Sequence, residues 1–200
     1  MKKNTSYKML ISNTIMKLIL VIQVCGCASR GQFTEGLKLY KRNKYSEAII
    51  YFDQALKNND KSNQAAFYKA MCLYELGSVD EAIYILAELG NKNPDDVSRG
   101  QISYALGGLL NSKGEYERAF SLYYSTILLG YEYKSLYTNT GLVLLNMGEC
   151  RRAIPFLRKD YERNTYNNNT LVALSDGYSC IGNTDSANYF KDLVRVQDSK

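Results

Sequence analysis

The side chains that could do chemistry in this chain are carboxylates and thiols, because its 200 residues include no histidine. The absence of histidine removes Ser-His and Cys-His nucleophile pairs and the commonest metal ligand. A carboxylate pair could still act, as in glycoside hydrolysis. Acids such as Glu75 and Glu115 fall at expected loops and helix starts, where they complement the helix dipole. Asp160 and Asp176 are single acids on expected helices. We therefore predict no enzymatic activity, with a carboxylate-dependent hydrolase as the weakest alternative.

The cysteines show no spacing typical of a metal site, and no CxxC pair occurs among the five. Cys72 and Cys150 fall on or beside expected packing positions, which favours buried thiols. A disulfide between Cys150 and Cys180 would need an oxidising compartment, and we expect these two thiols to stay free. No metal ion and no cofactor are predicted.

The first 27 residues differ in composition from the rest of the chain. Four lysines and no acid accompany a short apolar run at residues 18–22, which is followed by Val24-Cys25-Gly26-Cys27. A basic start, an apolar centre and a small residue before the cleavage point are typical of a secretory signal peptide. One alternative is an uncleaved membrane helix over residues 9–26, although four polar side chains interrupt a stretch that should be mostly apolar for about 20 residues. Plain secretion is the other.

The end of this segment resembles the lipobox of bacterial lipoproteins. Gly26 directly precedes Cys27 and Val24 stands three positions before it, whereas Cys25 would have Val24 directly before it. The resemblance implies that a signal peptide, residues 1–26, is cut before Cys27, that the Cys27 thiol takes a diacylglyceryl group and that the new amine is acylated. Several acyl chains anchor a protein stably to a membrane. The expected location is the bacterial cell envelope, on the outer membrane facing the periplasm, with residues 27–32 as a lipidated tether. The sequence leaves open whether Met1, Met9 or Met16 starts the chain.

Five alanines divide the rest of the chain at steps of 34, 37, 34 and 34 residues: Ala48, Ala82, Ala119, Ala153 and Ala187. Five residues before each alanine stands a glycine or Asn43, nine before stands an apolar residue, and twelve before stands a small one. Glycine and asparagine tolerate the left-handed conformation that ends a helix. A fixed period of this length indicates stacked helical hairpins, in which small residues lie where two helices cross.

This register resembles the tetratricopeptide repeat. The best matches to the family signature are Leu106-Gly107-x2-Leu110 with Ala119-x3-Tyr123, then Ala48-x3-Phe52, with Asn93-Pro94 as a closing proline. The tryptophan that opens the signature is absent from every copy. The resemblance implies an all-α fold, a right-handed superhelical solenoid of about five hairpins over residues 33–200. Its repeats would span about 29–62, 63–96, 100–133, 134–167 and 168–200. Pro155 falls early in an expected second helix and predicts a slight kink, not a break.

In that family, first-helix positions of each repeat face a concave groove. Mapped onto this chain, the N-terminal groove is aromatic and apolar, whereas Val172, Asp176 and Ser179 make the last repeat polar. Exposed aromatic side chains are typical of peptide-binding hot spots. The partner-binding residues that we predict are Phe33, Tyr40, Phe67, Met71, Tyr74 and Tyr104. Packing inside the repeats is the alternative role for these aromatic rings.

The net charge of +5 comes mostly from the N-terminal lysines, since 21 basic and 20 acidic residues remain after residue 26. A nearly neutral domain does not favour nucleic-acid binding. We predict a membrane-anchored scaffold that binds a peptide or partner protein, in envelope assembly or secretion. The alternative is a glycan- or small-ligand-binding lipoprotein that stacks its ligand on Tyr74 and Tyr104. Apolar residues from Phe190 to Val196 also predict an open end through which two copies dimerise.

Overall fold

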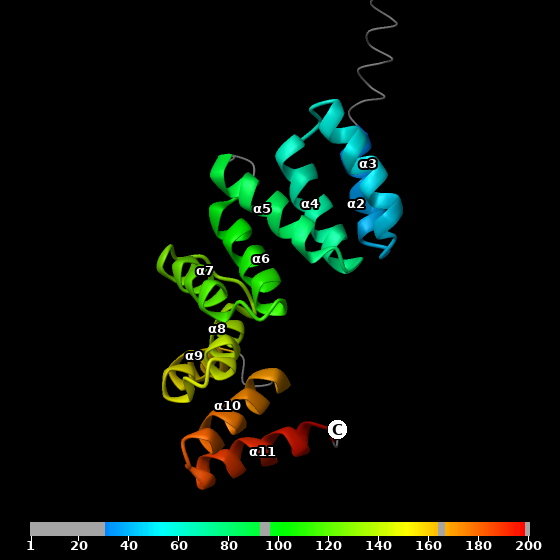
Figure 1. Ribbon diagram of the computed structural model, residues 1–200. Helices are drawn as coiled ribbons and strands as arrows, with labels where there is room; N and C mark the ends of the chain where they lie inside the picture. The colour runs from blue at the N-terminus through cyan, green and yellow to red at the C-terminus, as the bar shows by residue number, and fades with distance from the viewer. Residues whose placement is uncertain (1–30, 93–96, 164–166, 199–200) are drawn as a thin grey trace, which may run out of the picture. The chain divides into compact units, whose positions relative to one another are not determined.

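The described part of the chain consists of helices joined by turns. A computed structural model describes residues 31–92, 97–163 and 167–198, so the predicted signal peptide, Cys27 and Asn93-Pro94 lie outside the described residues. Within these ranges there is no strand, and the all-α helical-repeat fold is confirmed. The helices are α2 (Gln32–Tyr40), α3 (Tyr45–Lys57), α4 (Ser62–Glu75), α5 (Val79–Lys92), α6 (Arg99–Ser112), α7 (Tyr116–Leu128), α8 (Leu136–Asn146), α9 (Cys150–Arg163), α10 (Asn168–Cys180) and α11 (Thr184–Asp198) (Figure 1).

A left-handed backbone residue follows each first helix of a hairpin, as the register predicts. Asn43 has a φ of 58°, and the four glycines at the equivalent positions have φ between 75° and 85°. The next N–H then reaches back to the recurrent apolar residue. Lys44 N–H donates to the Leu39 carbonyl at 3.0 Å, and Glu149 N–H donates to the Leu144 carbonyl at 2.8 Å. This Schellman pattern satisfies carbonyls that the helix end leaves free, and it fixes where the chain reverses into the second helix.

Small residues allow the two helices of a hairpin to cross at close range. The recurrent alanines are buried in all five hairpins. A Cβ on Gly36 would lie 2.7 Å from the ring of Phe52, and a Cβ on Gly141 would lie 2.5 Å from the side chain of Leu157. The first helix therefore needs a small residue here, because a large side chain four residues after the alanine occupies the space.

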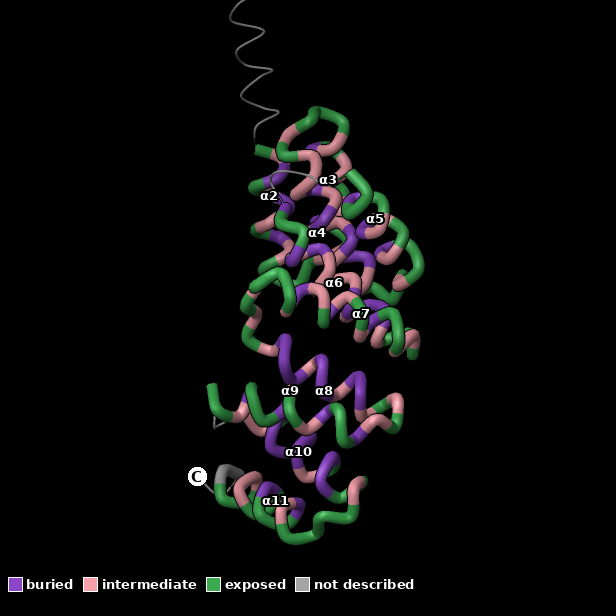
Figure 2. Tube along the Cα trace, turned by 90° about the vertical axis from the view of Figure 1, so that its left-hand side faces the viewer, coloured by how far each residue is buried: buried purple, intermediate pink, exposed green. Residues whose placement is uncertain are grey.

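The described residues from Gly31 to Ile85 form one compact unit, in which α2, α3 and α4 pack together. Buried and exposed residues alternate along these helices (Figure 2). The ring of Tyr68 lies 6.0 Å from the rings of both Phe33 and Phe52, measured between centroids. The buried core of this unit consists of Phe33, Leu39, Ala48, Phe52, Ala55, Ala65 and Cys72.

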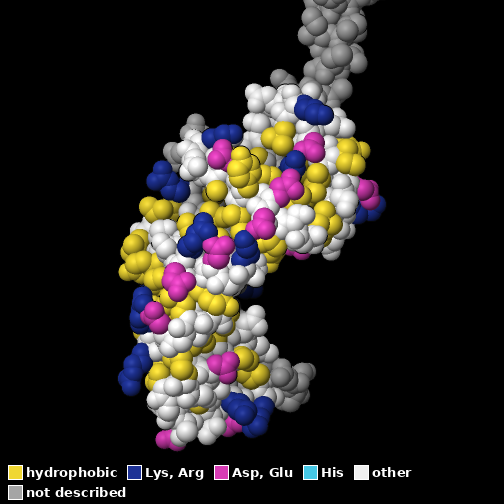
Figure 3. Space-filling view, viewed as in Figure 1, with side chains coloured by type: hydrophobic (Ala, Val, Ile, Leu, Met, Phe, Trp, Pro, Cys, Tyr) yellow, Lys and Arg dark blue, Asp and Glu magenta, His cyan; other side chains and the backbone are white. Residues whose placement is uncertain are grey.

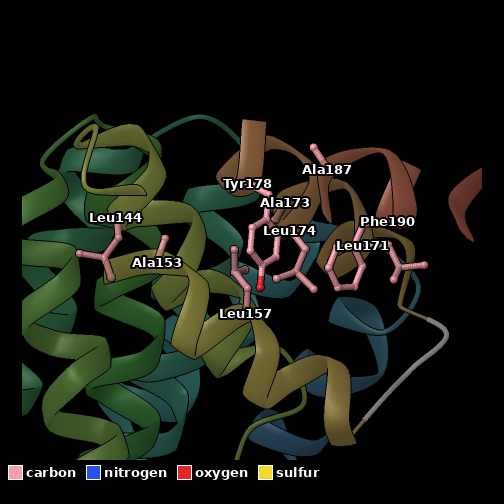
Figure 4. Close-up of a cluster of buried hydrophobic side chains, with 9 residues drawn as sticks. All are labelled: Leu144, Ala153, Leu157, Leu171, Ala173, Leu174, Tyr178, Ala187 and Phe190. Carbon is pink, nitrogen blue, oxygen red and sulfur yellow. The ribbon is translucent and has the colours of Figure 1, made fainter. Parts of the chain in front are cut away.

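Residues from Leu86 onward form a second compact unit. Within it, α8 packs against α6, α7, α9 and α10, which explains why seven of its eleven residues are buried. A cluster of nine buried side chains from α8 to α11 forms the core at the C-terminal end of this unit (Figure 4). Its members are Leu144, Ala153, Leu157, Leu171, Ala173, Leu174, Tyr178, Ala187 and Phe190.

Pro155 lies inside α9, which continues unbroken from Cys150 to Arg163. The prediction that this proline does not end the helix is confirmed. Among the described helices, none combines the length and the apolar composition needed to cross a membrane.

Candidate functional site

Asp160, which the sequence left without a partner, is buried and paired. Its side chain is 3% exposed, and one carboxylate oxygen accepts hydrogen bonds from the Thr170 hydroxyl at 2.6 Å and the Asn167 amide at 3.2 Å. Because the Thr170 proton is engaged, the Thr138 hydroxyl donates to Thr170 over 2.8 Å. The partners of Asp160 are thus a hydroxyl and an amide and not a second acid. This network joins α9 to α10 directly and to α8 through Thr170, which is a structural role.

The described residues contain no cluster of three His, Cys, Asp or Glu side chains that could hold a metal ion. Asp176 is exposed on α10. It lies in a groove with Lys191 and Arg195 rather than with a second acid. The groove beside Asp176 and the pocket beside Glu149 are each lined by a single described acid.

Two of the predicted partner-binding aromatics lie in the core instead. Phe33 is 5% exposed and Phe67 is 7% exposed. The Phe33 ring packs against Phe52 with 6.0 Å between centroids, and the Phe67 ring meets Tyr68 edge to face at 5.5 Å. The expectation that both rings face an open groove is corrected here, because neighbouring aromatic side chains enclose them.

Three other predicted residues of the first unit keep part of their surface in solvent. Tyr40, Met71 and Tyr74 are half-buried. The Tyr40 ring meets Tyr45 and Tyr68 edge-on, at 5.7 Å and 5.4 Å. Burial raises the pKa of Tyr40, and the nearby Glu75 carboxylate adds to the effect. Packing against Tyr45 and Tyr68 thus positions Tyr40, and all three side chains still offer apolar or aromatic surface.

Tyr104, in the second unit, is held between other tyrosines. Its ring stacks on Tyr133 at 4.7 Å with an interplanar angle of 18°, and Tyr123 lies 5.7 Å away. The Asn139 amide donates a hydrogen bond of 3.1 Å to the Tyr104 hydroxyl. Burial raises the pKa of this hydroxyl, and the hydrogen bond from Asn139 partly offsets that rise. One face of the ring is thus already occupied, which weakens the proposal that a saccharide stacks on it.

A groove of about 410 Å³ lies between α10 and α11. Val172, Asp176 and Ser179, which the resemblance places on the concave face of the repeats, line this groove between the two helices of the last hairpin. The second helix contributes Lys191 and Arg195, which sequence reasoning did not assign. The register could have identified Lys191, because this charged residue occupies the position that is apolar or aromatic in the earlier copies. Those copies have Phe52, Leu86, Tyr123 and Leu157.

Cys150 and Cys180 form a disulfide, with 6.2 Å between their Cα atoms. The expectation of two free thiols was therefore wrong. The bond joins the start of α9 to the end of α10, beside the turn at Gly148 and Glu149. Cys72 is a free, buried thiol, as predicted. Burial raises its pKa to about 12, with a further contribution from Glu75.

Comparison with known proteins bears on the fold. Residues 33–96 match the family model described as tetratricopeptide repeat. Solved structures of MamA are similar over most of the chain. "MamA MSR-1 C2" has a TM-score of 0.72 and 17% identity over 86% of this chain and 97% of that one. "MamA 41-end from Desulfovibrio magneticus RS-1" has a TM-score of 0.75 and 14% identity over 86% and 96%. "Crystal structure of MamA protein" has a TM-score of 0.72 and 20% identity over 88% and 94%.

Proposed function

Since residues 33–96 match the tetratricopeptide-repeat family model and the described residues have a helical-repeat fold similar to that of MamA, we propose that the protein is a membrane-anchored scaffold of the bacterial cell envelope. It binds a peptide or a partner protein and carries out no reaction of its own. Helical repeats present extended surfaces to other proteins, and the scaffold role follows from that geometry. Beyond the scaffold role, we propose that the protein is anchored by lipid, that it lies in the cell envelope, and that its partner contacts one surface of the first unit.

The contact surface in the first unit carries the proposal. Tyr40 on α2 and Met71 and Tyr74 on α4 are half-buried, and the Tyr40 ring is held edge-on against Tyr45 and Tyr68. Surfaces that are already ordered lose less conformational entropy on binding. Aromatic side chains also dominate the binding energy at many protein interfaces.

Two observations support the envelope as the compartment. The N-terminal segment has the charge, apolar run and Gly26-Cys27 ending of a lipoprotein signal. The Cys150–Cys180 disulfide is compatible with an oxidising compartment, whereas cytosolic thiols are mostly kept reduced.

The anchor is tested by replacing the cysteine that would carry it. Cys27→Ala should abolish incorporation of a fatty-acid label and release the protein from sedimented membranes. Cys25→Ala is the matched control and should label and sediment as the wild type does. A Cys27→Ala protein that still labels and still sediments would rule the anchor out.

The contact surface is tested by site-specific photo-crosslinking in native membranes. A crosslinker placed at position 74 should capture a defined partner. The matched control is position 84, because Tyr84 is also a tyrosine of the first unit but is 68% exposed on α5. Equal capture at both positions, or none at position 74, would contradict the proposed surface.

A further inference from the structure

The groove between α10 and α11 has the place and shape of a seat for one more helix. The same groove one hairpin earlier, between α8 and α9, is filled by α10. There, a Cβ on Gly177 would lie 3.5 Å from Ile154 and Leu145 and 4.0 Å from Leu157. The Thr170 hydroxyl of α10 also bonds to Thr138 on α8 and to Asp160 on α9.

Each residue that lines the filled groove has an equivalent in the open groove 34 residues later in the sequence. Thr138, Leu145, Ile154, Leu157 and Asp160 correspond to Val172, Ser179, Asn188, Lys191 and Val194. All five corresponding residues line the open groove. Because consecutive hairpins repeat one geometry, an α-helix that lies as α10 does would fit here.

The chemistry of the open groove differs from that of the filled one. Lys191 replaces Leu157, and Arg195 replaces Tyr161. These two cations lie one turn apart on α11, whereas Asp176 is the single acid that lines the groove. Arg195 lies 3.0 Å from Asp192, but both side chains are about two-thirds exposed, so this ion pair contributes little. Charged side chains of both signs lie among apolar ones on the face of the protein in Figure 3.

We propose that this groove binds an acidic amphipathic helix of another protein. Its apolar stripe covers Val172, Ala187 and Val194, and a carboxylate on the same face pairs with Lys191. The charge balance of the groove selects an acidic helix over a basic one. A second copy of this chain offers a poorer match through α2, since Glu35 and Lys38 leave that helix with no net charge.

The α10 sequence itself supplies the probe. A synthetic peptide of residues 167–181 carries Cys180→Ser and a hydrocarbon staple between positions 172 and 176, which are exposed on α10. Gly177 is replaced by Glu in one peptide and by Lys in its matched control. This position faces Leu157 in the filled groove, so it faces Lys191 in the open one.

Binding of both peptides to the full chain in detergent micelles is measured by fluorescence anisotropy. The Glu peptide should bind up to about fivefold more tightly than the Lys peptide, because an ion pair near a surface contributes up to about that factor. Lys191→Glu should reverse the order of the two peptides. Its unfolding midpoint should match the wild type, because Lys191 is exposed.

Three outcomes would overturn the proposal. The first is no binding of either peptide at about 1 mM, the weak limit of measurable affinity. The second is the same order of affinities in the wild type and in Lys191→Glu. The third is a dimer, measured by light scattering, that Lys191→Glu separates, because the occupant would then be a second copy.

Helix binding in this groove is a proposal beyond the membrane-anchored scaffold, and the two are tested by separate measurements. Cys27→Ala and Tyr74→Ala should both leave the binding of the Glu peptide unchanged. A Cys27→Ala protein that stays on the membranes and still binds the Glu peptide would therefore contradict the proposed function alone.

Discussion

The Thr170 hydroxyl donates a 2.6 Å hydrogen bond to the buried carboxylate of Asp160, and this bond ties the start of α10 to α9. Thr138 on α8 extends the same chain of hydrogen bonds. A buried polar group that loses its partner keeps its full desolvation cost. The three helices that frame the end of the second unit are thus joined by a polar network as well as by the apolar cluster.

Thr170→Val should lower the free energy of unfolding by about 1–3 kcal/mol. Valine has the same shape as threonine, but it leaves Asp160 with one of its two donors, the Asn167 amide, and leaves Thr138 without an acceptor on Thr170. Thr170→Ser keeps the hydroxyl, so its free energy of unfolding should fall less than that of Thr170→Val. Urea denaturation of the three proteins measures the difference, and equal losses for Val and Ser would show that the hydroxyl does not matter.

Gly141→Ala should destabilise the second unit, although alanine is the better helix former. The new Cβ would lie 2.5 Å from Leu157, and overpacking of this kind costs about 1–3 kcal/mol. Gly108→Ala is the matched control, since its Cβ would meet the Tyr123 hydroxyl at an ordinary 3.5 Å. That variant should gain up to about 1 kcal/mol from the lower entropy of the unfolded chain. Thermal unfolding compares the two, and a stabilised Gly141→Ala would contradict the close crossing.

The register predicts those features that depend on one hairpin and its own backbone. The left-handed turn residue at Asn43 and the crossing at Gly141 follow from spacing alone, because each repeat forms the same local contacts. Burial of Phe33 was not predictable in this way. A mapped position gives the direction of a helix face, but the rings of Phe52 and Tyr68 decide whether that face is open.

Features between consecutive hairpins were predicted less well. Tyr104 is covered by Tyr133, which precedes α8 and lies outside the repeated positions. The Cys150–Cys180 disulfide could have been found, since the first residue of one second helix lies near the last residue of the next first helix. The register thus brings the two cysteines, 30 residues apart, close together, but it does not show whether their thiols are oxidised.

Reduction of the Cys150–Cys180 bond should destabilise the second unit. The bond closes a loop of 30 residues, and such a crosslink restricts the unfolded chain by about 2–4 kcal/mol. Cys180→Ser should unfold at the same urea concentration as the reduced wild type. Alkylation of the denatured, unreduced protein followed by mass spectrometry gives the independent check, because labelled peptides containing residues 150 and 180 would mean that the bond is absent.

Cys72 should make the stability of the first unit fall at alkaline pH. Burial raises its pKa from 9.0 to about 12, so between these values the unfolded thiol loses its proton while the folded thiol keeps it. The unfolded state then binds fewer protons, and the free energy of unfolding decreases as pH rises from about 9 towards 12. Below pH 9 this contribution is constant. Cys72→Ala should flatten this part of the profile, although its smaller side chain lowers stability at every pH. Urea denaturation between pH 8 and pH 10.5 compares the two slopes. Parallel slopes, or alkylation of Cys72 in the folded wild type at pH 9 faster than the chain unfolds, would mean that the thiol is not shielded.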